Sequence, residues 1–440
     1  MSRALDKETV AALKAGDPEA AYRAIAAVLT EPRTAVSTED APSACFLSAP
    51  AKDRLEIEFF GGSRLPLPST QPGGNGYVLR DGNAVAIPKL ALVQAFFVAR
   101  KVLQQHRAAP ATTGSTADVA PPPAPPPPTD DLLAATAVIL LMDPEHLTAA
   151  NTRKRLLQAR VTAHAARNMA RGDGNAAVKA ALANEFRLVD SFLTSHLHRH
   201  TKSPTLWSHR RWLVSVASNV WTALDGDGNG NGNDNDAVFQ CITDVVMVAA
   251  VRHPRNYYAW EHARGLMQQY DGPLFSNDTT NNNRDGNAAD LLVAVRDWCY
   301  RHHNDTSGWS FFFFLIVLVL RPRGSASLAS SISYVRGILA HVEEMATSLR
   351  WTGESVWVFL RTAVAYMGQP HEPGNKSQDR KDDDVYDRFR AAATGLQGHV
   401  DAASREHAVL QQAQDWCATY FRASKSQNAE TGDRDFVLIS

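Results

Sequence analysis

Two passages of the chain decide how it folds. They are Pro204-Thr-Leu-Trp-Ser-His-Arg-Arg-Trp-Leu213 and His253-Pro-Arg-Asn-Tyr-Tyr-Ala-Trp-Glu-His-Ala-Arg-Gly-Leu266, and they are versions of one another. In each, a tryptophan is followed by basic residues within about one turn of a helix. Residues three and four apart share a helix face, so the indole can pack against a neighbouring helix while the basic group reaches past it. The two passages therefore predict one repeated, Trp-bearing helix.

Weaker copies of the same unit lie on both sides. Trp309 and Trp357 continue the series, and Thr148-Ala-Ala-Asn-Thr-Arg-Lys154 extends it backwards. The tryptophans are spaced by 53, 49 and 48 residues, but two stretches, 225–236 and 276–287, contain only polar residues and glycine. Such stretches have no apolar side chain to bury, so we interpret them as low-complexity insertions. Without them, the first two spacings approach the period of a helix-turn-helix repeat.

Asn/Pro-x-x-Trp-x-x-Arg-Arg in tandem helical hairpins resembles the alpha-subunit repeat of protein prenyltransferases. Arg255-Asn-Tyr-Tyr-Ala-Trp-Glu-His262 is close to the most characteristic form, whereas Asn151-Thr-Arg-Lys154 is more similar to the divergent repeat-containing branch of the family. The resemblance covers about residues 140 to 365. It implies an all-α fold, a right-handed α-α superhelix of five or so tandem hairpins, to which the sequence adds a small N-terminal α/β element.

The resemblance also implies a function. The chain is expected to be the alpha-type subunit of a protein prenyltransferase heterodimer, inactive alone, whose beta subunit carries the zinc and activates a protein cysteine. Zinc lowers the pKa of a thiol and so makes it nucleophilic. This chain would scaffold the partner and help bind the isoprenoid diphosphate. Likeness to the repeat-containing branch favours geranylgeranyl transfer.

The family's motif positions carry over residue by residue. Positions that lie near the diphosphate in the family correspond to Lys202, Arg255, Asn256, Tyr257 and Tyr258. The remaining motif positions are Arg153, Lys154, Trp207, Arg210, Arg211, Trp260, His262, Arg264, Trp309, Trp357 and Arg361. Ser203 and Pro204 replace the usual Asn-Tyr pair of the second copy, and phenylalanines follow Trp309 where the family has arginine.

Each of these residues also has a structural interpretation. The tryptophans can all be core residues, and most of the arginines can be solvated or paired within the stack. Lys202 and Tyr257 can serve equally well in hydrogen bonds between hairpins. A local charge imbalance favours an anionic ligand, because residues 151 to 211 contain 12 Lys or Arg and 3 acids in a chain of net charge −1. A diphosphate fits this field, and no nucleic-acid motif accompanies it.

The chain has 440 residues, 44% of them hydrophobic, which is ample for a large core. Its four cysteines have no paired spacing, so neither a disulfide framework nor a zinc ribbon is expected. The N-terminus is charged where a signal peptide is apolar, and the longest apolar run, Trp309 to Leu320, is shorter than the ~20 residues of a membrane span. These features favour a cytoplasmic protein with no membrane span.

The composition divides the chain into four segments. Residues 1–106 are the N-terminal α/β element, with strand or hairpin patterns at Arg54 to Phe60 and Tyr77 to Ile87. Residues 107–130 are a Pro-rich linker, 131–368 are the helical repeats, and 369–440 contain two capping helices.

Three further patterns are weaker. Asp225-x-Asp-x-Asn-Gly230 approaches a calcium loop, but its surroundings are Gly, Asn and Asp throughout. His196-x-His-x-His200 with His209, and Cys299-x-x-His302-His303, lack the ligands that would complete a metal site. We therefore expect no metal or cofactor on this chain.

No Gly-rich phosphate loop, nucleophile elbow or paired-carboxylate constellation is present, so an enzyme acting alone is not expected. The alternative from another class is a noncatalytic helical-repeat scaffold for protein-protein interaction.

Overall fold

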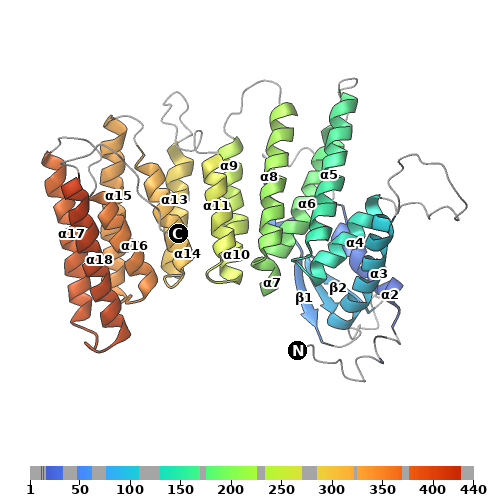
Figure 1. Cartoon of the computed structure of the whole chain (residues 1–440), viewed down its shortest axis with the longest axis horizontal. Helices are drawn as coiled ribbons and strands as arrows, with labels where there is room; N and C mark the ends of the chain where they lie inside the picture. Colours follow the sequence, from blue (N-terminus) through green and yellow to red (C-terminus); the bar gives the residue numbers. More distant parts are fainter. Residues whose placement is uncertain are drawn as a thin grey trace, which may run out of the picture. The chain divides into compact units, whose positions relative to one another are not determined.

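The computed structural model describes residues 11, 13, 16–32, 47–61, 76–108, 129–168, 175–224, 233–269, 285–321, 325–368 and 376–427. These residues are mostly helical, with one small sheet near the N-terminus (Figure 1). The chain divides into two compact units, Met1–Tyr270 and Asp271–Ser440, which we describe separately. The all-α repeat fold with a small N-terminal α/β element is thus confirmed.

Three helical hairpins build the larger part of unit 1. The first helix of each hairpin is followed by the helix that carries the Trp motif or its equivalent, and consecutive motif helices pack against each other. The hairpins are α4 (Thr129–Met142) with α5 (Leu147–Asn168); α6 (Asn175–Leu193) and the short α7 (His198–Thr201) with α8 (Pro204–Leu224); and α9 (Asn233–Cys241), the π-helical η2 (Ile242–Val246) and α10 (Met247–Arg252) with α11 (Tyr257–Gln269).

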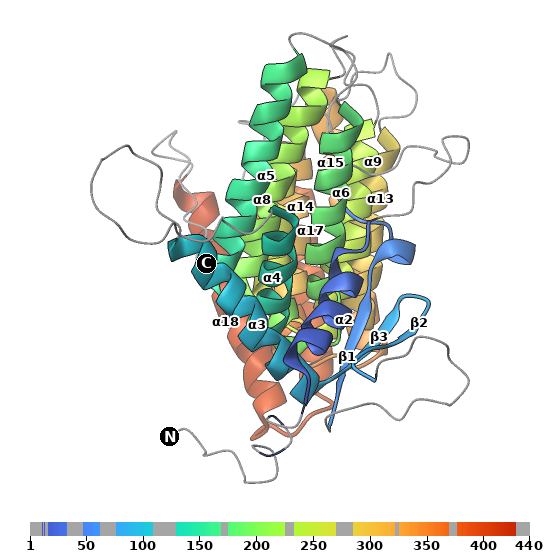
Figure 2. The ribbon, with the colours of Figure 1, turned by 90° about the vertical axis from the view of Figure 1, so that its right-hand side faces the viewer.

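The N-terminal element of unit 1 packs on one layer of these hairpins. It comprises α2 (Pro18–Thr30), η1 (Ala51–Asp53), β1 (Glu56–Phe60), β2 (Leu79–Asp81), β3 (Ala84–Pro88) and α3 (Lys89–Ala108). The sheet order is β1-β3-β2, with β1 parallel and β2 antiparallel to β3, and Gly82 adopts the positive φ of 56° that the β2–β3 turn requires. Figure 2 shows the strands on the α6 side of the hairpins, with α5 and α8 on the other side.

Specific hydrogen bonds attach this element to α6. The backbone N–H of Leu55 donates to Oγ of Ser191 at 2.8 Å, and the guanidinium of Arg187 donates to the carbonyls of Asp53 and Glu31. Buried donors and acceptors must find partners, and here they find them between the element and the repeats. The N-terminal element and the first three hairpins therefore form one compact unit.

Unit 2 contains two more hairpins and a terminal helix pair. Its helices are α13 (Asp285–Arg301), α14 (Thr306–Val319), α15 (Ser325–Ser348), α16 (Glu354–Met367), α17 (Lys376–Gln397) and α18 (Arg405–Gln427). The apolar run after Trp309 lies in α14, where most of its side chains are buried. None of the helices in the described part of the chain is long and apolar enough to cross a membrane.

The start of each motif helix is set four residues before the tryptophan position. In α5, α8, α11 and α14, the side chain there accepts a backbone N–H of the first turn, as expected for helix N-caps. The capping residues are His146, Ser203, Asn256 and Asp305. In α16 the equivalent residue is Gly353, which takes the extended N-cap conformation without a side-chain bond.

The four motif tryptophans, Trp207, Trp260, Trp309 and Trp357, are core residues, and each is at most 1% exposed. The indole nitrogens of Trp207, Trp309 and Trp357 each donate to the carbonyl six residues earlier. Each ring thereby fixes the turn that precedes its own helix. Trp260 is buried in the same way.

The division at residue 270 falls inside the predicted repeat segment 131–368, so the two compact units do not coincide with the four predicted segments. Those segments remain sequence-based predictions, as does a right-handed course of the whole repeat array. The predicted insertions are too long at their ends, since residues 233–236 open α9 and residues 285–287 open α13. The rest of both insertions, the approximate calcium loop and most of the Pro-rich linker lie outside the described residues.

Candidate functional site

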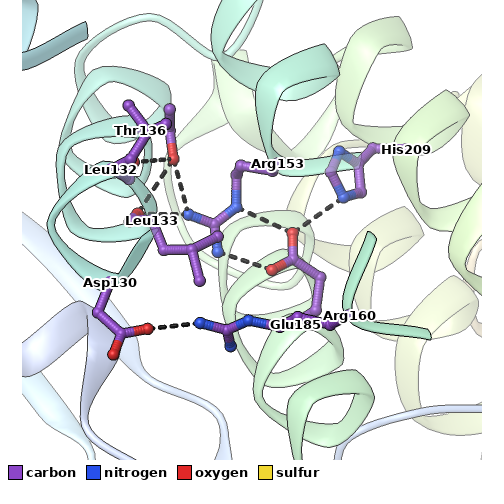
Figure 3. A network of polar contacts seen from close by, with 8 residues as sticks. All are labelled: Asp130, Leu132, Leu133, Thr136, Arg153, Arg160, Glu185 and His209. Carbon is purple, nitrogen blue, oxygen red and sulfur yellow. Dashed lines mark hydrogen bonds and ion pairs between the residues drawn. The ribbon is translucent and has the colours of Figure 1, made fainter. Parts of the chain in front are cut away.

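The first and second repeats are joined by a buried ion pair. Arg153 of α5 contacts Glu185 of α6 in bidentate fashion, with nitrogen-to-oxygen distances of 2.9 and 2.7 Å, and also donates to the Leu133 carbonyl and to Thr136 (Figure 3). Nε2 of His209 in α8 lies 2.9 Å from the same carboxylate. Burial alone raises the pKa of Glu185, but Arg153 and His209 reverse this and hold it well below its usual range.

A second buried ion pair lies within the second repeat, and its arginine also contacts the third. Arg210 of α8 is fully buried, and its Nε donates to Asp190 at 2.8 Å. Its Nη1 lies 2.6 Å from Nε2 of His262 in α11, and its Nη2 donates to the Leu47 carbonyl. Burial lowers the pKa of His262, and the neighbouring Arg210 lowers it further, so the ring is neutral and accepts the hydrogen bond.

These networks place three of the motif residues inside the protein. Arg153, Arg210 and His262 are each at most 5% exposed and pair with groups of the chain itself. Their side chains do not reach the surface of the chain. By contrast, Lys154 and Arg264 are half-buried and Arg211 is exposed.

The exposed candidates lie at two adjacent turns, before α8 and before α11. Lys202 and Arg255 are exposed, Tyr257 is 54% exposed, and Tyr258 is partly exposed. The rings of Tyr257 and Tyr258 meet edge to face with 5.8 Å between centroids. Arg255 has a positive φ of 58°, a strained conformation for a residue with a side chain, which the tight turn into α11 imposes. Four of the five predicted diphosphate-facing residues therefore reach the surface.

Asn256 is the exception, because its side chain does not reach the surface. Its side chain is fully buried: Nδ2 donates to the Thr201 carbonyl at 2.9 Å, and Oδ1 accepts the backbone N–H of Ala259. It caps α11 and joins the third repeat to the second, so no group remains on the surface for a phosphate. Ser203, at the equivalent position of the second repeat, caps α8 and donates to the Pro144 carbonyl in the same manner.

Contacts between the two turns bring additional basic groups to this surface. Arg252 contacts the ring of His196, and the rings of His198 and His253 meet edge to face at 5.6 Å. The sequence patterns did not single out Arg252 or His253 as site residues, because neither is a motif position. Their placement before the α11 turn was the available signal. We refer to the surface formed by Lys202, Arg255, Tyr257 and Tyr258 as the turn surface.

The motif residues of unit 2 have apolar surroundings. Trp309 packs on Phe359 with ring centroids 4.9 Å apart, and Trp357 packs on Phe389 at 5.8 Å. The guanidinium of Arg361 lies 4.9 Å from the ring of Trp416 in α18. These residues stabilise the packing of consecutive helices.

The model of the protein prenyltransferase alpha subunit repeat matches residues 182–216 and 243–270. The chain carries this repeat at two places. The matched segments contain the second and third Trp motifs, both turns described above, and the buried Arg210–Asp190 pair. No curated protein matches the chain.

In the described part of the chain, no three histidine, cysteine or acidic residues come together as metal ligands. Of the predicted histidine pattern, His196 is exposed, whereas His200 is buried and its Nε2 contacts the Leu140 and Leu141 carbonyls. Burial lowers the pKa of His200 to about 4, and the carbonyl bonds oppose this only in part.

Proposed function

We propose that this chain is the alpha-type subunit of a protein prenyltransferase heterodimer. In this proposal it scaffolds a zinc-bearing beta subunit and helps bind an isoprenoid diphosphate while the lipid is transferred to a cysteine of a protein substrate. The zinc belongs to the partner, and this chain is inactive alone. The resemblance favours a geranylgeranyl lipid and a cytoplasmic enzyme.

The observation that supports this proposal is the separation of roles among neighbouring motif residues. Within the two matched repeats, Trp207, Arg210, Asn256 and Trp260 are buried, whereas Lys202 and Tyr257 remain exposed at the starts of successive motif helices. A residue needed only for packing would be expected to be covered. Exposure leaves an ammonium and a phenol available for an anion.

The electrostatics of the turn surface support the same assignment. α8 begins at Pro204 and α11 at Tyr257, and the N-terminal end of a helix carries partial positive charge. Lys202 and Arg255 add full charges beside these two helix ends. The developing negative charge on a leaving diphosphate would be stabilised here. Tyr257 can donate its phenolic O–H to a phosphate oxygen.

The test is single-turnover transfer of a labelled isoprenoid to a cysteine-containing acceptor by the purified heterodimer. Lys202→Ala and Tyr257→Phe should each slow transfer by about ten- to a hundredfold, because a charge-assisted hydrogen bond contributes roughly 1.5 to 3 kcal/mol. Folding and heterodimer formation should be unchanged. Lys101→Ala, which removes an exposed lysine from α3, is the matched control.

Asn256→Ala separates the two roles, because it should lower stability while leaving the transfer rate per folded heterodimer near normal. Wild-type rates in both Lys202→Ala and Tyr257→Phe would overturn the diphosphate assignment. Absence of activity from wild-type chain with any beta subunit, together with a different stable partner on co-purification, would favour the noncatalytic scaffold.

A further inference from the structure

A row of basic side chains crosses the three motif helices of unit 1. Lys154 of α5, Arg211 of α8 and Arg264 of α11 occupy the same position, four residues after the tryptophan position, in successive repeats. We call these three residues the cation row. α5 packs against α8, and α8 against α11. The row therefore runs across the helices rather than along one of them.

The first two cations each lie close to the motif helix of the next repeat. Nζ of Lys154 lies 5.8 Å from the ring centroid of Trp212 in α8. Nε of Arg211 lies 3.9 Å from where a Cβ of Gly265 in α11 would stand. The two side chains therefore lie at the boundaries between neighbouring motif helices, so the basic groups form one continuous row. As whole residues, Lys154 is half-buried and Arg211 is exposed, as is usual for long cationic side chains whose stems pack on apolar surface.

In the part of the chain that the structure describes, the first two cations lack an acidic partner. Among the described residues, no carboxylate forms an ion pair with Lys154, with its exposed neighbour Arg155 or with Arg211. Arg153, next to Lys154, has its charge matched by Glu185. In the third repeat, Arg264 lies 3.7 Å from Glu261, one turn earlier on the same helix. The positive charge of the row is thus strongest at α5 and α8.

We propose that the cation row is a docking surface for an acidic α-helix of a protein partner, laid across α5, α8 and α11. Packed helices lie about 8 to 10 Å apart, so successive cations recur at about that interval. On a helix with a rise of 1.5 Å per residue, carboxylates seven residues apart recur every ~10.5 Å. An acidic helix with one or two carboxylates per heptad on one face therefore matches the row in both charge and spacing.

The spacing distinguishes this ligand from a nucleic acid. Each strand of a nucleic-acid duplex presents one phosphate about every 3.4 Å along the duplex axis, much more densely than the row presents cations. Half-buried Trp212 offers apolar contact between the first two cations, which suits a helix that carries aliphatic side chains between its carboxylates. The surface is separate from the turn-surface residues assigned to the diphosphate, so the inference does not depend on prenyl transfer.

The probe is a fluorescein-labelled, Ala-rich peptide of about 24 residues with two glutamates per heptad on one face, a length at which an Ala-rich helix forms. Its binding to the full chain is measured by fluorescence anisotropy at low ionic strength. A peptide of the same composition, with its glutamates distributed around the helix, is the reference. We expect the one-faced peptide to bind about tenfold more tightly.

Charge-changing variants test the row. Lys154→Glu with Arg211→Glu should weaken binding of the one-faced peptide by about tenfold or more, whereas Arg100→Glu with Lys101→Glu on α3, which changes the net charge equally, should not. Glu261→Gln should strengthen binding about two- to fivefold, because it removes the carboxylate that competes for Arg264. Melting curves establish that each variant is folded. If the double charge reversal does not fold, Arg211→Gln alone replaces it in the binding measurement.

Equal losses in the two charge-reversed double variants would overturn the proposal, because binding would then report net charge only. It would also be overturned by equal affinity for the two peptides, or by tighter, row-dependent binding of a single-stranded oligonucleotide.

Discussion

The two units build the same contact between consecutive repeats from opposite chemistries. In unit 1, Trp207 packs beside His262 of the next motif helix, and Arg210 donates to that ring. In unit 2, Trp309 packs beside Phe359 at the position equivalent to His262, and Phe312, equivalent to Arg210, stacks on it with centroids 5.2 Å apart. A buried charge network and a pair of phenylalanines thus occupy the same place in the repeat.

This difference shows which part of the motif forms the fold. The tryptophan and the helix that it anchors are common to both units, whereas the arginine is replaceable wherever phenylalanine can fill the volume. The stability of the polar version is more sensitive to substitution, because removing one partner of a buried ion pair leaves an uncompensated charge. The apolar version depends only on packing. Variants can exchange the two chemistries and measure their consequences.

Asp190→Ala should have the largest effect. It leaves the Arg210 guanidinium buried without a carboxylate, and it also removes the acceptor of the Ala49 backbone N–H. We expect the free energy of unfolding of unit 1 to fall by roughly 3 to 5 kcal/mol. Hydrogen exchange resolved by segment is the suitable measurement, since a chain of two units need not unfold in a single step. Protection should fall in residues 129–269 and change little in residues 285–427.

The rescue of this variant sharpens the comparison. Asp190→Leu with Arg210→Met removes both charges and imitates the apolar chemistry of unit 2, so part of the lost stability should return. The Ala49 N–H and the Leu47 carbonyl still lose their partners, so recovery should be incomplete. A double variant less stable than Asp190→Ala would show that the ion pair stabilises unit 1 beyond satisfying its own charges.

The two units should also respond to pH in opposite directions. The lowered pKa of His200, about 4, means that its contribution to unit 1 is present above pH 6.5 and is lost as the pH falls toward 4. Burial raises the pKa of Glu343 in unit 2 to about 7, while Arg388 opposes the shift only in part. Its contribution is present below pH 4.5 and is lost as the pH rises through 7.

Each of these two contributions amounts to at most roughly 3 kcal/mol, and neutral variants should remove them separately. His200→Gln should flatten the acid-side loss of protection in unit 1, and Glu343→Gln should flatten the loss between pH 4.5 and 7 in unit 2. Protection factors corrected for intrinsic exchange provide the measurement. Parallel pH dependence of the two units in all three proteins would contradict this assignment.

The sequence predicted the repeat fold because a tryptophan followed by basic residues within one helical turn recurs in the chain and marks the motif helices. The β2–β3 hairpin could also be predicted from the sequence, since Asp81-Gly82 between two alternating runs specifies a tight turn. The ends of the insertions were harder to predict. Asn233 to Asp236 has no apolar periodicity, yet it forms the first turn of α9, whose later residues Ala237 and Val238 are buried.

The candidate site could be predicted only in part from the sequence. Motif register indicated which residues lie near each turn, but it did not tell Asn256, which is buried as a cap, from Tyr257, which is exposed one residue later. The burial of Arg210 depends on Asp190, twenty residues earlier, and on the Leu47 carbonyl, which no spacing within the repeats reveals. Tertiary partners of this kind decide whether a motif arginine is structural or available.

The smallest effect concerns the N-caps. Oγ of Ser203 in unit 1 accepts the Leu206 N–H and donates to the Pro144 carbonyl of the preceding repeat. Asp305 of unit 2 accepts the N–H groups of Ser307 and Gly308. Ser203→Ala should therefore cost about 1 to 2 kcal/mol, the loss of a cap together with a buried hydrogen bond. Ser203→Thr should retain most of this stability because the hydroxyl remains. Ser203→Asp can still cap the helix, but it presents a carboxylate to the Pro144 carbonyl and should not recover the second contact.

Denaturant unfolding with segment-resolved exchange distinguishes the cases. If Ser203→Asp equals wild type, the cap alone accounts for the effect and the link between repeats contributes nothing; if Ser203→Thr is as unstable as Ser203→Ala, the hydroxyl has neither role.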